Sequence, residues 1–152
     1  MIKINIVCVG NLKDKFFIEA CEEYIKRLSR FCVINVKELK EHTNLDNIEQ
    51  IKLAEGQDII KNIKGYAILL DVKGKLLSSE ELATQLQSLT LNNSELTFII
   101  GGSYGVSEQV KQKVNFIISM SKMTFPHRLF RVMLLEQIYR AFTILNNVGY
   151  HK

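Results

Sequence analysis

The residues most able to do chemistry lie in the last third of the chain, and the first of them form a glycine-rich loop. Gly101 and Gly102 follow an apolar run, and a glycine pair lets backbone amides approach a ligand without obstruction from a Cβ atom. The spacing Gly-Gly-x-x-Gly fits neither the dinucleotide fingerprint nor the P-loop, which needs a Lys-Ser/Thr pair. The pair therefore marks either a ligand-binding loop or a plain tight turn.

Three further groups in this third are candidates for catalysis. His127 can exchange a proton near neutral pH, and it can equally cap or pack at the start of a helix. Arg140 follows Glu136 by four residues, the order that favours an ion pair on a helix face. An unpaired guanidinium would be costly there, because the rest of the helix is apolar. The terminal Tyr150-His151-Lys152 is basic and aromatic, in a place where a chain ordinarily frays.

Cysteine usage and hydropathy exclude several classes of protein. Cys8, Cys21 and Cys32 are odd in number and have the spacing of neither a disulfide framework nor a metal site. The N-terminal run is too short for a membrane span and lacks a signal-peptide cleavage site. We therefore expect a reduced, cytoplasmic protein with no metal and no membrane partner.

Charge is distributed unevenly along the chain. The net charge is +4, yet residues 101–152 hold seven Lys or Arg against two Asp or Glu, so the whole positive excess lies in the last third. A basic segment of this kind suits an anionic partner, nucleic acid first, and it is also compatible with a plain solvated face.

The element that must position these groups is the helix that follows Pro126, the only proline in the chain. Proline is favoured at the first helical position, and it forces Phe125 before it toward an extended loop. Apolar side chains then recur on nearly every side, so we expect burial on nearly all sides. In a chain of 152 residues, we expect a second copy of the protein to supply part of that burial.

The rest of the chain alternates between strand and helix patterns. Predicted strands are Ile2–Val9, Cys32–Leu39, Tyr66–Asp71, Glu95–Ile100 and Phe116–Met120. Predicted helices are Lys15–Arg30 with Asp14 as N-cap, a segment from Asp46 with an irregular middle near Gly56, one opened by a capping box from Ser78 to Glu81, and a short one capped by Ser107. Lys73-Gly74-Lys75 is predicted to be a turn. This order predicts a single α/β domain, residues 1–152, with a mainly parallel sheet flanked by helices.

In an open parallel sheet, ligands bind beyond the carboxyl ends of the strands. Three loops leave predicted strands in the second half of the chain: the one after Leu70-Asp71, the one at 101–105, and the one from Ser121 to Pro126. We therefore expect the ligand site to be built from these three loops.

Taken together, four motifs resemble those of the RlmH family. They are Ile99-Ile-Gly-Gly-Ser-Tyr-Gly-Val-Ser107, Met123-Thr-Phe-Pro-His127, Leu135-Glu-Gln-Ile-Tyr-Arg-Ala141 and Tyr150-His-Lys152. The resemblance covers the whole chain, and its C-terminal motifs are specific. It implies a SPOUT-type α/β fold with a C-terminal trefoil knot and a homodimer. It also implies S-adenosylmethionine as methyl donor and N3 of a pseudouridine in bacterial 23S ribosomal RNA as acceptor.

The resemblance also implies which residues form the site. The cofactor contacts fall on Leu70, Gly102 and the loop of Ser121, Lys122, Met123, Thr124, Phe125 and Pro126. The candidate catalytic residues are Arg140, Tyr150 and His151, of which His151 or the cation Arg140 would assist loss of the N3 proton. The family commonly has proline before the terminal Tyr-His, where this chain has Gly149. We therefore expect a tail that stays mobile until RNA binds.

Three alternatives stay open. One is a SPOUT methyltransferase acting at a different RNA position. Another is a non-catalytic RNA-binding or ribosome-assembly module, in which the glycines only form turns. A dinucleotide-dependent oxidoreductase is the most distant, since its fingerprint is missing.

Overall fold

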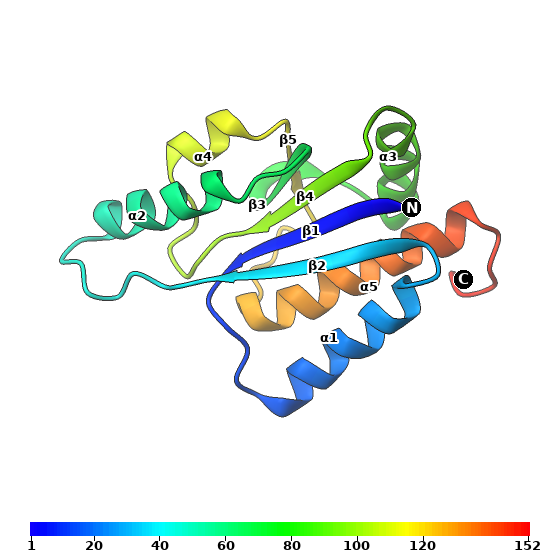
Figure 1. Cartoon of the computed structure of the whole chain (residues 1–152), viewed down its shortest axis with the longest axis horizontal. Helices are drawn as coiled ribbons and strands as arrows, with labels where there is room; N and C mark the ends of the chain where they lie inside the picture. Colours follow the sequence, from blue (N-terminus) through cyan, green and yellow to red (C-terminus); the bar gives the residue numbers. More distant parts are fainter.

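The computed structural model describes residues 1–152 as one α/β unit built on a five-stranded sheet (Figure 1). The elements are β1 (Ile2–Val9), α1 (Lys15–Leu28), β2 (Cys32–Leu39), α2 (Ile48–Lys61), β3 (Tyr66–Leu76), α3 (Ser79–Asn92), β4 (Glu95–Ile100), α4 (Glu108–Lys113), β5 (Phe116–Ser119) and α5 (His127–Leu145). The strand order is β2-β1-β4-β3-β5, and every neighbouring pair is parallel. The predicted α/β architecture is therefore confirmed.

Helices cover both faces of the sheet, as apolar parallel strands require. On one face, α1, α3 and α5 pack against a core cluster of 21 buried residues that includes Phe98, Leu134 and Ile138. On the other face, α2 and α4 contribute Ile59 and Val110 to a second cluster of nine buried residues. Figure 1 shows α5 running under the sheet beside α1, with α2 and α4 on the opposite side.

Helix α5 is the element that closes the larger core. Pro126 is its N-cap, and the first helical residue is His127, one position later than predicted. The helix packs between α1 and α3, so its buried residues are covered within the chain, and Leu129 is its only exposed large apolar side chain. The apolar surface of α5 is therefore explained largely by one copy of the protein.

A buried charge fixes the start of α5 to the sheet. The guanidinium of Arg131 is 4% exposed, and its Nη1 lies 2.6 Å from Oε2 of Glu38 at the end of β2. Its Nη2 donates to the carbonyl oxygen of Gly10, which follows β1, at 3.2 Å. The two carboxyl-end segments of β1 and β2 are thereby tied to α5.

The structure corrects four predicted details. Strand β3 continues through the expected turn at Lys73-Gly74-Lys75 to Leu76, with a register shift between Leu70 and Lys75 in its pairing with β5. Helix α2 is continuous across Gly56. The side chain of Ser107 packs against this glycine where a Cβ would be, which explains a glycine inside the helix. Helix α1 ends at Leu28, and β5 ends at Ser119.

The caps follow the sequence closely. Ser78 and Glu81 form the predicted reciprocal capping box, and the Ser107 hydroxyl accepts from the amide of Val110. Asp14 occupies the predicted N-cap position of α1 but makes no side-chain cap hydrogen bond. No helix combines the length and apolarity needed to cross a bilayer.

Candidate functional site

A cavity of about 460 Å³ opens at the carboxyl ends of β3, β4 and β5. It is lined by the three segments that the sequence singled out, together with the first turn of α5; the loops after β4 and β5 are observed as loops, whereas the segment at 70–72 belongs to β3. The lining residues are Leu70, Asp71, Val72, Ile100, Gly101, Gly102, Ser103, Gly105, Val106, Ser119, Met120, Ser121, Met123, Thr124, Phe125, Pro126, His127 and Phe130. The size and the mixed apolar and backbone lining are typical of a small-molecule site.

Seven of the eight residues expected at the cofactor line this cavity. They are Leu70, Gly102, Ser121, Met123, Thr124, Phe125 and Pro126. The eighth, Lys122, is exposed and is not part of the lining. Its ammonium group is therefore free to face solvent or an anionic partner beside the cavity.

Two of the loops have a fixed backbone geometry. Gly102 and Gly105 face each other in an isolated antiparallel bridge, in which the Gly105 amide donates to the Gly102 carbonyl at 3.0 Å. Gly105 has φ +84°, which favours glycine. In the loop after β5, the Ser119 hydroxyl donates to the Ser121 carbonyl at 2.8 Å, and the Ser121 hydroxyl accepts from the Met123 amide at 3.0 Å. The cavity walls are thus held by local hydrogen bonds.

Two titratable side chains line the cavity. His127 makes no cap hydrogen bond, and its buried Nε2 has no hydrogen-bond partner; the nearest acid oxygen, Oε1 of Glu41, is 3.9 Å away. Asp71 follows the buried part of β3, accepts from the Lys73 amide, and lies 3.9 Å from Nζ of Lys111. The unpartnered nitrogen of His127 is therefore buried on the side of Gly10 and Glu41, which do not line the cavity.

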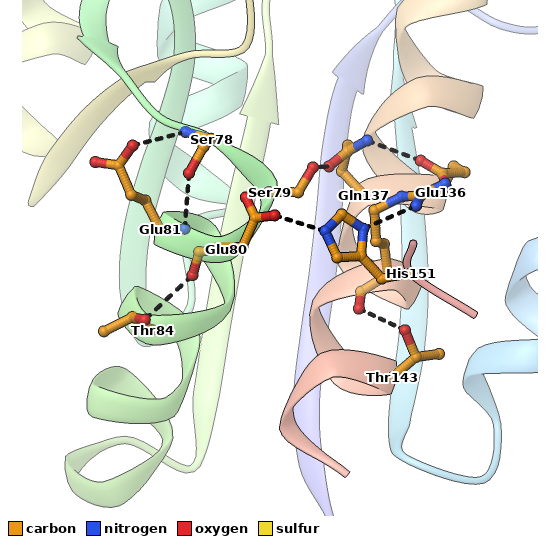
Figure 2. Close-up of polar contacts among 10 residues, drawn as sticks. Ser78, Ser79, Glu80, Glu81, Thr84, Glu136, Gln137, Thr143 and His151 are labelled. Carbon is orange, nitrogen blue, oxygen red and sulfur yellow. Dashed lines mark hydrogen bonds and ion pairs between the residues drawn. The ribbon is translucent and has the colours of Figure 1, made fainter. Parts of the chain in front are cut away.

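The three candidate catalytic residues meet in a second cluster, which we call the tail cluster: Glu80, Glu136, Arg140, Tyr150 and His151. The Glu136 Oε1 atom accepts from Nε and Nη2 of Arg140 at 2.9 and 2.6 Å and from the Tyr150 hydroxyl at 3.2 Å. Figure 2 shows His151 between Glu80 of α3 and the residues of α5. The expected Glu136–Arg140 pair is confirmed, and the hydrogen bonds to Glu136 raise the pKa of Arg140.

The contacts of His151 define its tautomer. Its Nδ1 lies 3.0 Å from Nη1 of Arg140, and because arginine can only donate, Nδ1 must be the acceptor. Its Nε2 lies 2.6 Å from Oε1 of Glu80, so Nε2 carries the proton and donates it. Both ring nitrogens of His151 are therefore occupied while it stays docked there.

Tyr150 has a different role from a base. Burial, with smaller contributions from Tyr24 and Glu136, raises the pKa of Tyr150 to about 12. Its ring packs edge-on against Tyr139, with centroids 4.8 Å apart, and the Arg140 guanidinium lies 4.8 Å from its centroid. The phenol stays protonated at neutral pH and acts as a packing and hydrogen-bonding group.

The cavity and the tail cluster lie at opposite ends of α5. His127 and Arg140 are 13 residues apart, a rise of about 20 Å along the helix axis. In Figure 1 the C-terminus lies at the end of the molecule where β1 begins, opposite the strand ends that form the cavity. Tyr150 and His151 are half-buried and held by the contacts above, so the expectation of a mobile tail is wrong. Gly149, which has open space around it, leads the chain back onto α3 and α5.

Reading the sequence missed two buried charges near the cavity. One is Arg131, whose charge falls among the apolar residues of α5 and gave no signal of its own. The other is Glu55, an acid in the middle of α2 that lies directly behind Gly102. No group of three or more His, Cys, Asp or Glu side chains is placed to hold a metal ion.

Comparisons with known proteins agree with this geometry. A family model described as "Predicted SPOUT methyltransferase" matches residues 2–151. The chain is 51% identical to the ribosomal RNA large subunit methyltransferase H of Clostridium botulinum (strain Alaska E43 / Type E3), over 98% of this chain and 99% of that protein. It is 44% identical to the protein of the same name from Caldicellulosiruptor saccharolyticus, with the same coverage. Among solved structures, a probable methylase family protein from Haemophilus influenzae Rd KW20 matches with a TM-score of 0.58 at 13% identity, over 98% of this chain and 70% of that one, which shows a shared fold.

Proposed function

Because the chain belongs to the ribosomal RNA large subunit methyltransferase H family of SPOUT methyltransferases, we propose that it methylates 23S ribosomal RNA at N3 of a pseudouridine, with S-adenosylmethionine as donor. The observation that carries the proposal is the cavity at the carboxyl ends of β3, β4 and β5, lined by loops that leave room for a ligand.

The residues present fit the donor. Its adenosine and methionine parts need a small-molecule cavity with apolar walls and exposed backbone groups, and a cavity of about 460 Å³ lined by Leu70, Gly102 and Phe125 offers both. When bound, S-adenosylmethionine supplies a methyl group on a positively charged sulfur, so the chemistry requires no metal. The loops Gly101–Val106 and Ser121–Pro126 would hold it and keep water from the reacting atoms.

The chain must also remove a proton from the acceptor. N3 of pseudouridine carries an imide hydrogen, which is lost as the nitrogen takes the methyl group. We propose that the neutral imidazole of His151 accepts that proton on Nδ1 once Nδ1 has left Arg140, and that the guanidinium of Arg140 then stabilises the anionic base. Tyr150 would position the tail, since its phenol stays protonated.

A second copy of the chain completes this site in the proposal. About 20 Å of helix separates the tail cluster from the cavity within one chain. A two-fold axis across the middle of α5 would set two α5 helices antiparallel and bring each tail to the partner's cavity. The exposed Phe16, Met123 and Leu129 are apolar groups at the cavity end that a partner would cover. We therefore propose a homodimer with two composite sites.

Complementation between two inactive variants tests the composite site. Gly102→Val removes the cavity, and deletion of residues 150–152 removes the tail. A mixed dimer holds one site with an intact cavity and an intact tail, so an equal mixture, after exchange of subunits, should regain about a quarter of the wild-type activity. Each variant alone should stay inactive. Sedimentation should give a dimer for the wild type and for both variants. A mixture that exchanges subunits without regaining activity would mean that each chain builds its site alone.

Mass mapping of 23S ribosomal RNA tests the reaction itself. RNA from cells without this protein should lack one methyl group on a pseudouridine, and the purified protein with S-adenosylmethionine should restore it. A methyl group restored at another nucleotide would favour the alternative of a different RNA position. Calorimetry with S-adenosylhomocysteine identifies the assembly-module alternative, which predicts no heat of binding.

Two finer features belong to the same proposal. After its register shift, β3 pairs again with β5 through Lys75 and Ile118 and through Leu76 and Ser119, which sets the loop after β5 close to the segment that leaves β3. We propose that α5 passes through this region as the C-terminal trefoil knot of the SPOUT fold. We also propose that the protein acts in the cytoplasm, where a ribosomal substrate would be found.

A further inference from the structure

Glu55 is a buried carboxylate with no cationic partner. It lies in the middle of α2 and is 5% exposed. Its Oε2 accepts a hydrogen bond from the backbone amide of His42 at 3.1 Å, while the ring of His42 pairs with Asp58 at 2.8 Å. Burial is the main cause that raises the pKa of Glu55; the backbone amide and the ring of His42 lower it in part, and the negative charges of Glu41 and Asp58 raise it further. Burying a carboxylate without an ion-pair partner lowers the stability of the fold.

The second oxygen of Glu55 lies against the cavity wall. A Cβ atom built on Gly102 would be 2.7 Å from Oε1 of Glu55, so the carboxylate touches the backbone of that glycine directly. Gly102 lines the cavity on its other side. One residue of backbone therefore separates an uncompensated negative charge from the space that the proposed donor would fill.

Methyl transfer changes the charge of the ligand in that space. The bond between the methyl group and sulfur breaks, its electron pair stays on sulfur, and the positively charged sulfonium becomes a neutral thioether. The acceptor nitrogen gains the methyl group and gives up its proton to a base. Donor and product thus have nearly the same shape and differ by one positive charge.

We propose that Glu55 is a specificity-determining residue that makes the cavity prefer the charged donor over its neutral product. The inference rests on the function proposed above. A fixed negative charge attracts the sulfonium and leaves the thioether unaffected, so it favours loading of the donor and release of the product. Two unit charges on the order of 10 Å apart in a protein interior change a binding constant by about tenfold.

The test compares the binding of S-adenosylmethionine and S-adenosylhomocysteine by calorimetry for the wild type and Glu55→Gln. Glutamine keeps the size of the side chain and an oxygen that can accept from the His42 amide. We expect S-adenosylmethionine to bind about tenfold more weakly, with S-adenosylhomocysteine unchanged. Glu49→Gln is the matched control, because it removes a charge from an exposed position of the same helix. It should leave both affinities unchanged.

Thermal unfolding separates this role from a structural one. Because the pKa of Glu55 is raised in the fold, its ionisation destabilises the fold; this penalty is complete above the folded pKa and is lost as the pH falls from the folded pKa to the lower pKa of the unfolded chain. Glu55→Gln should therefore melt no lower than the wild type at neutral pH, and any gain should vanish in acid.

Three outcomes would overturn the inference. If both ligands weaken equally, Glu55 only positions the Gly102 loop. If neither affinity changes, the charge is not sensed in the cavity. If the wild type binds neither ligand, the proposed function fails, and the selectivity of the cavity fails with it.

Discussion

Deletion of residues 150–152 is expected to lower methylation of the ribosomal substrate by at least ~100-fold, the low end of what one positioned acid–base group contributes. The deletion removes His151, whose Nδ1 lone pair is the proton acceptor of the proposed mechanism. Affinity for S-adenosylmethionine should be unchanged, because none of the three residues lines the cavity. Single-turnover methylation with excess enzyme measures the loss.

Stability should fall only slightly in the same variant. The Glu80–His151 pair is exposed on the Glu80 side and contributes little to stability, while Tyr150 gives up its packing against Tyr139. His151→Ala alone should retain part of the activity if, as we propose, Tyr150 and Lys152 help to hold the RNA. Glu80→Gln is the matched control: it removes the charge opposite Nε2 of His151 and leaves Nδ1 and the rest of the tail intact, so methylation should not fall. Full activity of the truncated protein would move the proton acceptor to His127 or to the surroundings of Arg140.

Replacement of Gly102 by valine is expected to abolish donor binding while the fold persists. The first added carbon would lie 2.7 Å from Oε1 of Glu55 and 3.2 Å from Cγ1 of Val9, so the loop must shift. Because Gly102 belongs to a bridge between two loop residues and to none of the strands, this shift deforms the cavity wall and spares the core. Calorimetry should show no heat with S-adenosylmethionine, and circular dichroism should be that of the wild type.

Gly149→Val provides the comparison for this substitution. The same side chain is added at a glycine that has open space around it and does not line the cavity of its own chain, so donor binding should stay at the wild-type level. Tight binding by a well-folded Gly102→Val protein would place the donor elsewhere on the molecule.

The sequence was sufficient for the elements whose signals are local. The strands Ile2–Val9, Cys32–Leu39 and Glu95–Ile100 are observed with their predicted bounds, because each is a short apolar or alternating run. The caps at Ser78 and Ser107 depend on residues three positions apart and were equally visible. The cavity loops after β4 and β5 followed from a rule about parallel sheets that needs only the order of the elements, while the third cavity segment, expected as a loop after Leu70-Asp71, is part of β3.

Features that depend on distant partners were not visible. Lys73-Gly74-Lys75 has the composition of a turn, yet Gly74 lies in β3. The glycine is needed there because backbone atoms of Ile117 and Ile118 occupy the space where a Cβ would be. Arg131 and Glu55 are single charges in apolar or mixed helices. Arg131 contacts Glu38 and Gly10, and Glu55 contacts Gly102; these partners are 47 or more positions away in the sequence. The docking of the tail on Glu80 is non-local in the same way.

The bonds of Arg131 to Glu38 and Gly10 also bear on how the chain is made. They join residues 93 and 121 positions apart, and the helix that carries Arg131 supplies Leu134, Leu135 and Ile138 to the larger core. During synthesis, the first strand and the surface that α5 will cover are made long before α5 exists. Contacts of such long range form slowly and leave apolar surface open to aggregation in the meantime. We therefore expect the nascent chain to depend on chaperones until its last 25 or so residues have been translated, and premature termination before α5 to yield an insoluble fragment.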